Sequence, residues 1–345
     1  MGQGLSQRFS ASQPALLLLR LLILGVGLGV LTGTVLKLLA PRYSGEIKAA
    51  IPTITPVFNG NTMGDFKPAF ELNNLSQTFT KLADSQPNLK AGAFVLVLDN
   101  GNYAQLNPDI PLPAASSIKT PILLAAFEAI DQGKAKLNEK LSLSKVVVGG
   151  GSGWMGSQPI GTRFRFYEVA TEMIRVSDNT ATNLLIQRLG GKTALNARFI
   201  ELGLTGTTIK NWLPDLDGTN TTTPRDQALA IALVETGKEL TPRSRDLFRS
   251  TLGTSKTDTL IPSGWLQGLG GGSDEVNADL LSKGVRIFNK TGDIGIAYVD
   301  SALIELPDGK RAVASFMVKG PFNDPRSADL IRAMAAAAAS SLGAK

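Results

Sequence analysis

Strand signals at both ends of the chain constrain its fold more than any other feature. Phe94–Asp99 and Asn102–Leu106 are rich in strand-forming residues and flank an Asn-Gly turn, which predicts a β-hairpin. A second hairpin is predicted near the C-terminus, where Tyr298–Leu306 and Arg311–Val318 flank a Pro-Asp-Gly turn. Since helical patterns fill most of the chain between them, we expect both hairpins to contribute to an antiparallel sheet.

The intervening segments combine helical spacing with glycine stops or capping residues. Helices are predicted over Phe166–Val176, Ala181–Leu189, Thr193–Leu202 and Asp226–Glu235, and an alanine-rich one over Ser327–Leu342. The pattern indicates an α+β fold, with an antiparallel sheet covered by helices and an additional helical lobe. A functional site is expected in the cleft between the two parts.

The N-terminal part of the chain has a different character. Residues 14–40 are apolar apart from Arg20 and Lys37, and the 16 uncharged residues between these two correspond to roughly 24 Å of helix. The flanking charges would reach the headgroups of a bilayer core of about 30 Å, so we expect one transmembrane anchor, with a cleaved signal as the alternative. We therefore divide the chain into a tail with an anchor or signal (1–41), a linker (42–74) and a folded domain (75–345).

Composition excludes several kinds of chemistry. The 345 residues include no histidine and no cysteine, which rules out imidazole bases, disulfides and thiolate metal sites. We expect no metal and no cofactor. The net charge is +6, but residues 1–50 hold five basic residues against one acidic residue, or +4. Without a basic face carrying interleaved aromatics, nucleic-acid binding is not expected.

A hydroxyl nucleophile in this chain must therefore be activated by a lysine or a carboxylate. Ser116 precedes Lys119 by three residues, which places both side chains on one face of a helix beginning there. Pro121 is compatible with a helix start nearby. Taken alone, the pair is weak evidence, because a capping serine and a solvated lysine would better account for it.

Two further triplets are candidates for the same site. Ser177-Asp178-Asn179 lies between two predicted helices, and its alternative interpretation is a helix cap. Lys290-Thr291-Gly292 lies on a predicted strand before the C-terminal hairpin. Its alternative interpretation is an edge-strand lysine followed by a bulge glycine.

The order S-x-x-K, S-D-N, K-T-G is the signature set of class A β-lactamases and penicillin-binding proteins. Over roughly residues 75–345 the chain resembles the class A β-lactamase-like, penicillin-recognising serine hydrolases. The resemblance extends to the stretches Gly149–Gly156, Asp178–Leu185 and Thr221–Pro224.

The resemblance assigns a role to each motif residue. Ser116 is expected to be the nucleophile and Lys119 its base, which must be neutral to act; partial burial and a second cation, Lys290, would favour that form. Ser177 is expected to relay a proton to the leaving nitrogen. The expected substrate-binding residues are Asn179, Thr291, Gly292 and Asp293, and backbone N–H groups of Ser116 and Asp293 would form the oxyanion hole.

The sequence departs from the family in one loop. Class A β-lactamases carry a deacylating glutamate in a Trp-Glu-Pro-Glu-Leu-Asn-like run, and the comparable run here is Trp212–Asp217, with Leu213 at the glutamate position. Loss of a general base slows its step by about 10²–10⁴-fold. Asp215 or Asp217 is a candidate substitute, and the alternative for both is a role in capping the loop.

These residues predict a membrane-anchored serine hydrolase, outside the cytoplasmic membrane, that is acylated by β-lactams at Ser116 and deacylates slowly. The first alternative is a D-alanyl-D-alanine peptidase acting on peptidoglycan stem peptides. A second is a non-catalytic envelope binding module that uses the same cleft. The oligomeric state stays open.

Overall fold

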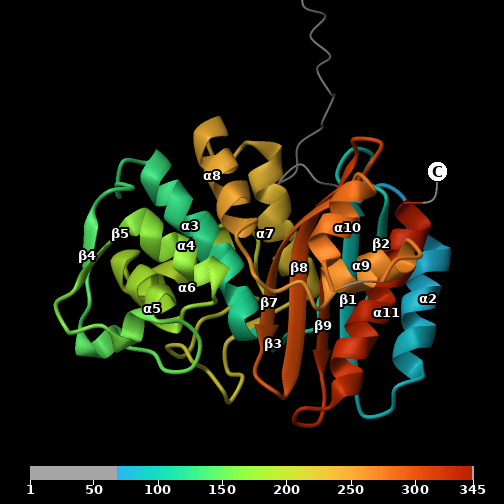
Figure 1. Cartoon of the computed structure of the whole chain (residues 1–345), viewed down its shortest axis with the longest axis horizontal. Helices are drawn as coiled ribbons and strands as arrows, with labels where there is room; N and C mark the ends of the chain where they lie inside the picture. Colours follow the sequence, from blue (N-terminus) through green and yellow to red (C-terminus); the bar gives the residue numbers. More distant parts are fainter. Residues whose placement is uncertain (1–67, 273, 344–345) are drawn as a thin grey trace, which may run out of the picture. The chain divides into compact units, whose positions relative to one another are not determined.

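The computed structural model describes residues 68–272 and 274–343. Its centre is a five-stranded antiparallel sheet in the order β2-β1-β9-β8-β7 (Figure 1). The N-terminal hairpin joins the C-terminal one directly, with Val95 opposite Ala314. The predicted antiparallel sheet is thereby confirmed. The strands are β1 (Lys90–Val97), β2 (Tyr103–Leu106), β7 (Arg286–Asp293), β8 (Ala297–Glu305) and β9 (Arg311–Lys319).

One face of the sheet is covered by three helices: α2 (Asn73–Asp84), α9 (Ile261–Gly268) and α11 (Pro325–Leu342). Their core includes Phe79, whose ring meets that of Phe316 edge-on at 5.7 Å between centroids. The alanine-rich sequence of α11 permits unusually close packing, because a Cβ on Gly264 of α9 would lie 2.4 Å from the Arg332 carbonyl oxygen. Small residues on both helices therefore allow α9 and α11 to pack closely against each other.

The opposite face packs on α7 (Pro224–Thr236) through residues such as Phe94 and Ile231. Beyond α7 lies the helical lobe, green and yellow in Figure 1, built around α3, which is buried over Lys119–Ala129. The other helices of this part are α4 (Phe166–Arg175), α5 (Asn179–Arg188), α6 (Gly191–Glu201) and α8 (Pro242–Leu252), and α3 itself spans Lys119–Asp131.

Several short elements complete the fold. Strand β3 (Leu112–Pro113) pairs with β6 (Thr221–Thr222), and β4 (Lys140–Ser142) pairs with β5 (Arg163–Arg165). The remaining elements are the 3₁₀ helices η1 (Ala115–Ile118), η2 (Lys145–Val147) and η3 (Met155–Ser157), and the helix α10 (Val276–Ser282).

Three helices, α8, α9 and α10, lie where no helix was predicted. A start signal for α8 was present, because Thr241 accepts a hydrogen bond from the Ser244 N–H and Pro242 opens the first turn. Glycine and proline within α9 concealed it, since both residues usually mark turns.

The folded part also begins earlier than predicted. The Tyr103 N–H donates to the Phe70 carbonyl and the Leu72 N–H donates to the Tyr103 carbonyl, so the last residues of the predicted linker (42–74) pair with β2. The predicted anchor over 14–40 lies outside the described residues. Among the helices that are described, none combines the length and apolar character needed to cross a bilayer.

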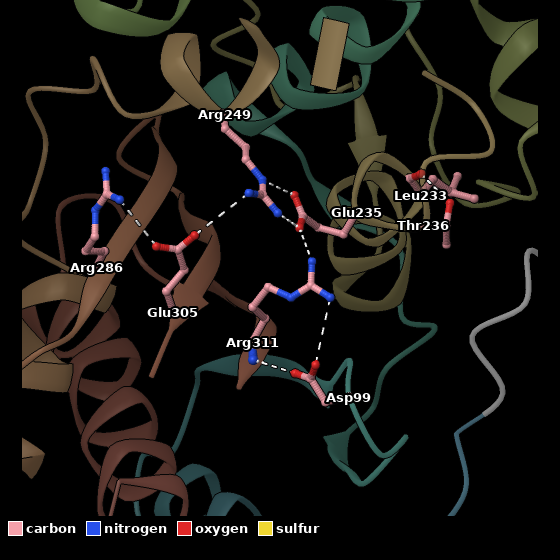
Figure 2. Close-up of polar contacts among 8 residues, drawn as sticks. All are labelled: Asp99, Leu233, Glu235, Thr236, Arg249, Arg286, Glu305 and Arg311. Carbon is pink, nitrogen blue, oxygen red and sulfur yellow. Dashed lines mark hydrogen bonds and ion pairs between the residues drawn. The ribbon is translucent and has the colours of Figure 1, made fainter. Parts of the chain in front are cut away.

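An ion-pair network joins the helical part to the sheet (Figure 2). Glu235, at the end of α7, has a side chain only 1% exposed and contacts both Arg249 of α8 and Arg311 of β9. The backbone N–H of Arg311 also donates to Asp99 at 2.6 Å, and Arg249 lies 4.0 Å from Glu305 of β8. The network thereby links α7, α8 and β9 through the buried Glu235 carboxylate and reaches β8 through Arg249.

Candidate active site

Ser116 lies on η1, between β3 and α3, against the free edge of β7. The two backbones touch at Gly292, where an added Cβ would lie 2.8 Å from the Ser116 nitrogen and 2.9 Å from that of Ser117. Gly292 is also in regular register with Val299 of β8. The bulge interpretation of this glycine is therefore wrong, and its missing side chain permits β7 to reach the serine.

Lys119 is the first residue of α3 and is completely buried. Its Nζ lies 2.9 Å from Ser116 Oγ, 2.9 Å from Ser177 Oγ, 2.7 Å from the Ser177 carbonyl oxygen and 2.9 Å from Asn179 Oδ1. Four oxygens therefore surround one nitrogen, whereas an ammonium can donate only three hydrogen bonds, so a charged Lys119 could not satisfy all four. The interpretation of Lys119 as a solvated lysine is wrong.

The environment of Lys119 favours a neutral amine. Burial is the largest cause that holds its pKa well below the ordinary 10.5, the positive charge of Lys290 adds to the effect, and Asp178 opposes it. A neutral amine keeps a lone pair, which can accept the proton of a hydroxyl at 2.9 Å.

The Ser177-Asp178-Asn179 triplet serves two purposes at once. Asp178 caps α5 by accepting from the Ala181 N–H at 2.8 Å, as the capping interpretation predicted. Ser177, held at a left-handed φ of 58°, and Asn179 instead contact Lys119. The Asn179 amide also donates to the Gly150 carbonyl at 2.9 Å, which ties the glycine-rich stretch to the site.

Lys290 is buried on β7, and its Nζ donates to the Thr291 carbonyl at 2.7 Å. Burial lowers the pKa of Lys290 to about 8, against the opposing effect of Asp300. Asp300 lies on β8 opposite Thr291 and is itself completely buried, and burial raises its pKa to about 6. Asp300 was not predicted, although an acid flanked by apolar and small residues in the interior of β8 was a usable signal.

Two hollows meet at Ser116. The larger, about 250 Å³, is lined by Ser116, Ser177, Lys290 and Thr291, and extends to Arg332 of α11. The smaller, about 100 Å³, lies between Ser116, Asn179 and the Leu213 loop. Asp293 and Ser152 line both, and Ser152 belongs to the glycine-rich stretch but was not singled out from the sequence.

The loop around Leu213 is held by the chain itself. Asn183 accepts from the Leu213 N–H at 3.0 Å and donates to its carbonyl at 2.8 Å, and the Leu213–Pro214 peptide bond is cis. The Asp215 carboxylate accepts from the Asn220 N–H at 2.6 Å and from a threonine hydroxyl at 2.8 Å. Asp217 is exposed. These contacts favour a loop-bracing role for Asp215.

The cleft offers lysines, hydroxyls and amides together with the carboxylates of Asp215 and Asp293. Over residues 68–272 and 274–343, carboxylates do not gather in a group of three or more that could hold a metal ion.

A family model described as "Beta-lactamase enzyme family" matches residues 74–342. Together with the fold and the cleft, this match and similar β-lactamases define the class of the protein as a serine hydrolase. The chain belongs to that family, and the resemblance predicted from the three motifs is confirmed.

Individual relatives agree with this assignment. The solved structure of PBP-A is 41% identical, with a TM-score of 0.73 over 80% of this chain and 98% of that chain. A β-lactamase from Sphaerobacter thermophilus is 23% identical, with a TM-score of 0.65 over 78% of this chain and 97% of that one, and shows the same fold. Beta-lactamase 3 of Bacillus cereus is 25% identical over 209 residues, which span 56% of this chain and 63% of that protein.

Proposed function

We propose that this protein forms an acyl-enzyme at Ser116 with β-lactams and releases the acyl group slowly. The observation that carries the proposal is the completely buried Lys119 amine, 2.9 Å from each of two serine hydroxyls. A purely binding cleft has no use for a buried, neutral amine against a hydroxyl, so the non-catalytic alternative is disfavoured.

The acylation step follows from these contacts. The Ser116 hydroxyl gives its proton to Lys119 Nζ while its Oγ attacks the lactam carbonyl. The carbonyl oxygen takes up negative charge, which the backbone N–H groups of Ser116 and Asp293 would stabilise. When the C–N bond breaks, the nitrogen leaves with a proton that Ser177 Oγ passes on from Lys119. This exchange restores the neutral amine and leaves an ester on Ser116.

The slow second step is proposed from the smaller hollow. A water attacking the ester would need a base there, and Leu213, the residue at the family's glutamate position, lines the hollow without offering one. The Asp215 carboxylate in the same hollow already accepts hydrogen bonds from its own loop. For the first step, acylation, support comes from PBP-A, of which a leucine-to-glutamate mutant was solved as an acyl-enzyme complex with penicillin G.

The second candidate is a D-alanyl-D-alanine peptidase that acts on peptidoglycan stem peptides through the same acyl-enzyme. It is favoured by the greater identity to PBP-A, 41%, than to the β-lactamases at 23–25%. For either activity we propose that residues 14–40 anchor the domain outside the cytoplasmic membrane.

Intact mass spectrometry of the full-length protein with benzylpenicillin tests the proposal. We expect an adduct of one penicillin that persists over many minutes and is absent from Ser116→Ala. The matched control is Ser117→Ala, because this neighbouring hydroxyl donates to the Ala114 carbonyl and should not be needed. No adduct on the native protein would overturn the proposal, and rapid hydrolysis of a chromogenic cephalosporin would overturn its slow second step.

A further inference from the structure

We propose that Asp300 is a positioning residue that turns the Thr291 hydroxyl proton away from the cleft and so leaves recognition of a substrate carboxylate to Lys290. The inference rests on the proposed function, because the substrate concerned is the β-lactam that acylates Ser116. It narrows the role of Thr291, which the sequence predicts as a substrate-binding residue, because the hydroxyl proton of that residue is already used inside the protein.

Thr291 and Asp300 are cross-strand neighbours. They are direct partners in the antiparallel register of β7 and β8, and Thr291 Oγ1 lies 3.3 Å from Asp300 Oδ1. Thr291 lines the larger hollow beside Ser116, whereas Asp300 is completely buried. The pair therefore connects the wall of the cleft to a carboxylate that a substrate cannot contact.

The other contacts of Asp300 are those of an ionised carboxylate. Its Oδ2 accepts from the Ile261 N–H at 2.9 Å, and its two oxygens lie 3.0 and 3.1 Å from the Asn289 amide nitrogen. That amide also donates to the Thr257 carbonyl at 2.9 Å, which identifies this end of the Asn289 side chain as the nitrogen. Because a carboxylate only accepts hydrogen bonds, Thr291 must be the donor in its contact with Asp300.

This direction of donation decides what Thr291 can offer to the cleft. A threonine hydroxyl has one proton and two lone pairs, so a proton directed at Asp300 leaves only lone pairs for other partners. The Asn289 amide nitrogen, 3.3 Å from Thr291 Oγ1, approaches as a donor and fits that orientation. A substrate carboxylate also only accepts, and it would have to draw the proton away from a buried anion.

Lys290 does not share this restriction. It lines the same hollow, and its Nζ donates to the Thr291 carbonyl at 2.7 Å. An ammonium has three protons, so two remain for a substrate carboxylate. Attraction to the Lys290 charge should therefore account for most of the recognition of that group.

Asp300→Asn should reverse the orientation of the Thr291 hydroxyl. The Ile261 N–H requires an acceptor at the Oδ2 position, so the asparagine oxygen should lie there and its NH₂ group beside Thr291. That group donates to Thr291 Oγ1, and the Thr291 proton becomes available to the cleft. Since a hydrogen bond typically changes an equilibrium by roughly twofold to tenfold, recognition of a substrate carboxylate should strengthen by a factor in this range.

The test compares benzylpenicillin with its methyl ester, which lacks the carboxylate and keeps the lactam. The second-order rate of acylation by each compound is measured by intact mass at pH 7, where Asp300, with a pKa of about 6, is mostly ionised. We expect Asp300→Asn to raise the acid-to-ester ratio of the two rates roughly threefold to tenfold. A general disturbance of the site would change both rates together and leave this ratio unmoved.

The matched control is Asp308→Asn, which removes an exposed carboxylate from the β8–β9 turn and should leave the ratio at its native value. Asp300→Ala provides a second variant should the asparagine fail to fold. It should raise the ratio too, because it removes the acceptor that holds the Thr291 proton. An unchanged or lower ratio in a folded Asp300 variant overturns the inference.

A double variant separates the direction of the proton from the effect of charge. Asp300→Asn also removes a negative charge near the cleft, which by itself would favour an anionic substrate. Thr291→Val has no hydroxyl, so adding Asp300→Asn to that background should raise the ratio much less. A rise as large as in the single variant would overturn the inference, because charge alone would explain it. Failure of the native protein to be acylated by either compound would instead overturn the proposed function.

Discussion

Replacing Leu213 by glutamate should convert slow release of the acyl group into turnover. Leu213 is buried and lines the hollow beside Ser116, and its backbone N–H and carbonyl are both hydrogen-bonded to Asn183. The substitution therefore changes what the hollow contains while the loop keeps its anchor. A carboxylate placed there can accept a proton from a water that attacks the Ser116 ester.

The size of the effect follows from general base catalysis. A positioned base contributes about 10²–10⁴-fold, or roughly 3–5 kcal/mol of barrier. Because Leu213 is only 5% exposed, burying the glutamate carboxylate should lower the free energy of unfolding by at least the roughly 1–3 kcal/mol that a neutral polar group costs. That loss affects stability and leaves the expected gain in deacylation measurable on folded protein.

The assay follows the decay of the penicillin adduct by intact mass after excess drug is removed. Leu213→Gln is the matched control, since glutamine has the same shape and no basic carboxylate. We expect glutamate to shorten the adduct lifetime at least a hundredfold and glutamine to leave it nearly unchanged. Equal acceleration by both variants would refute the reasoning, because it would show that the leucine only excludes water.

Three further predictions concern Gly292, Glu235 and Asp300. Gly292→Ala should slow acylation at least tenfold, because its Cβ would lie 2.8 Å from the Ser116 nitrogen and displace the serine. The rate of penicillin labelling measures the effect. The control Gly272→Ala, whose Cβ would have no atom within 4 Å, should be labelled at the native rate. Glu235→Gln should lower the free energy of unfolding, measured by urea titration, by about 2–3 kcal/mol. This loss is at or below the roughly 3–5 kcal/mol of a broken, fully buried ion pair, because the two arginine partners are 27% and 34% exposed. An unchanged midpoint of the urea transition would contradict this. The folded-state pKa of Asp300 is raised from 3.8 to about 6, so the stabilisation from its protonated form is fully present below about pH 4 and lost as pH rises through 6. The native protein should therefore lose roughly 3 kcal/mol relative to Asp300→Asn across that window, and parallel urea curves at every pH would contradict this.

The sheet was predictable because its hairpin strands are recognisable from local sequence patterns. Both hairpins carry turn residues between apolar runs, and the antiparallel order needs only that they meet. The helix α8 was missed although its start signal at Thr241 and Pro242 is local, whereas α9 was missed because its glycines serve close packing against a distant partner, α11. Local propensity carries no information about such partners.

The site divides in the same way. The motifs identified Ser116, Lys119, Ser177 and Lys290, since their spacing along the chain carries the signal. The sequence did not reveal that Lys119 would have no solvent contact, or that a buried acid, Asp300, would lie opposite Thr291 on the neighbouring strand. Burial and cross-strand register create these features, and both depend on pairing between β7 and β8.

The position of β7 beside η1 has a consequence for biosynthesis. A ribosome delivers Ser116 and Lys119 roughly 170 residues before β7, the strand that completes their pocket and docks onto β8. A nascent chain that has already folded its helical half would still lack the second ammonium and one wall of the cleft. Truncated translation products should therefore be inert toward penicillin, and reactivity should emerge only once the terminal hairpin has closed onto β1.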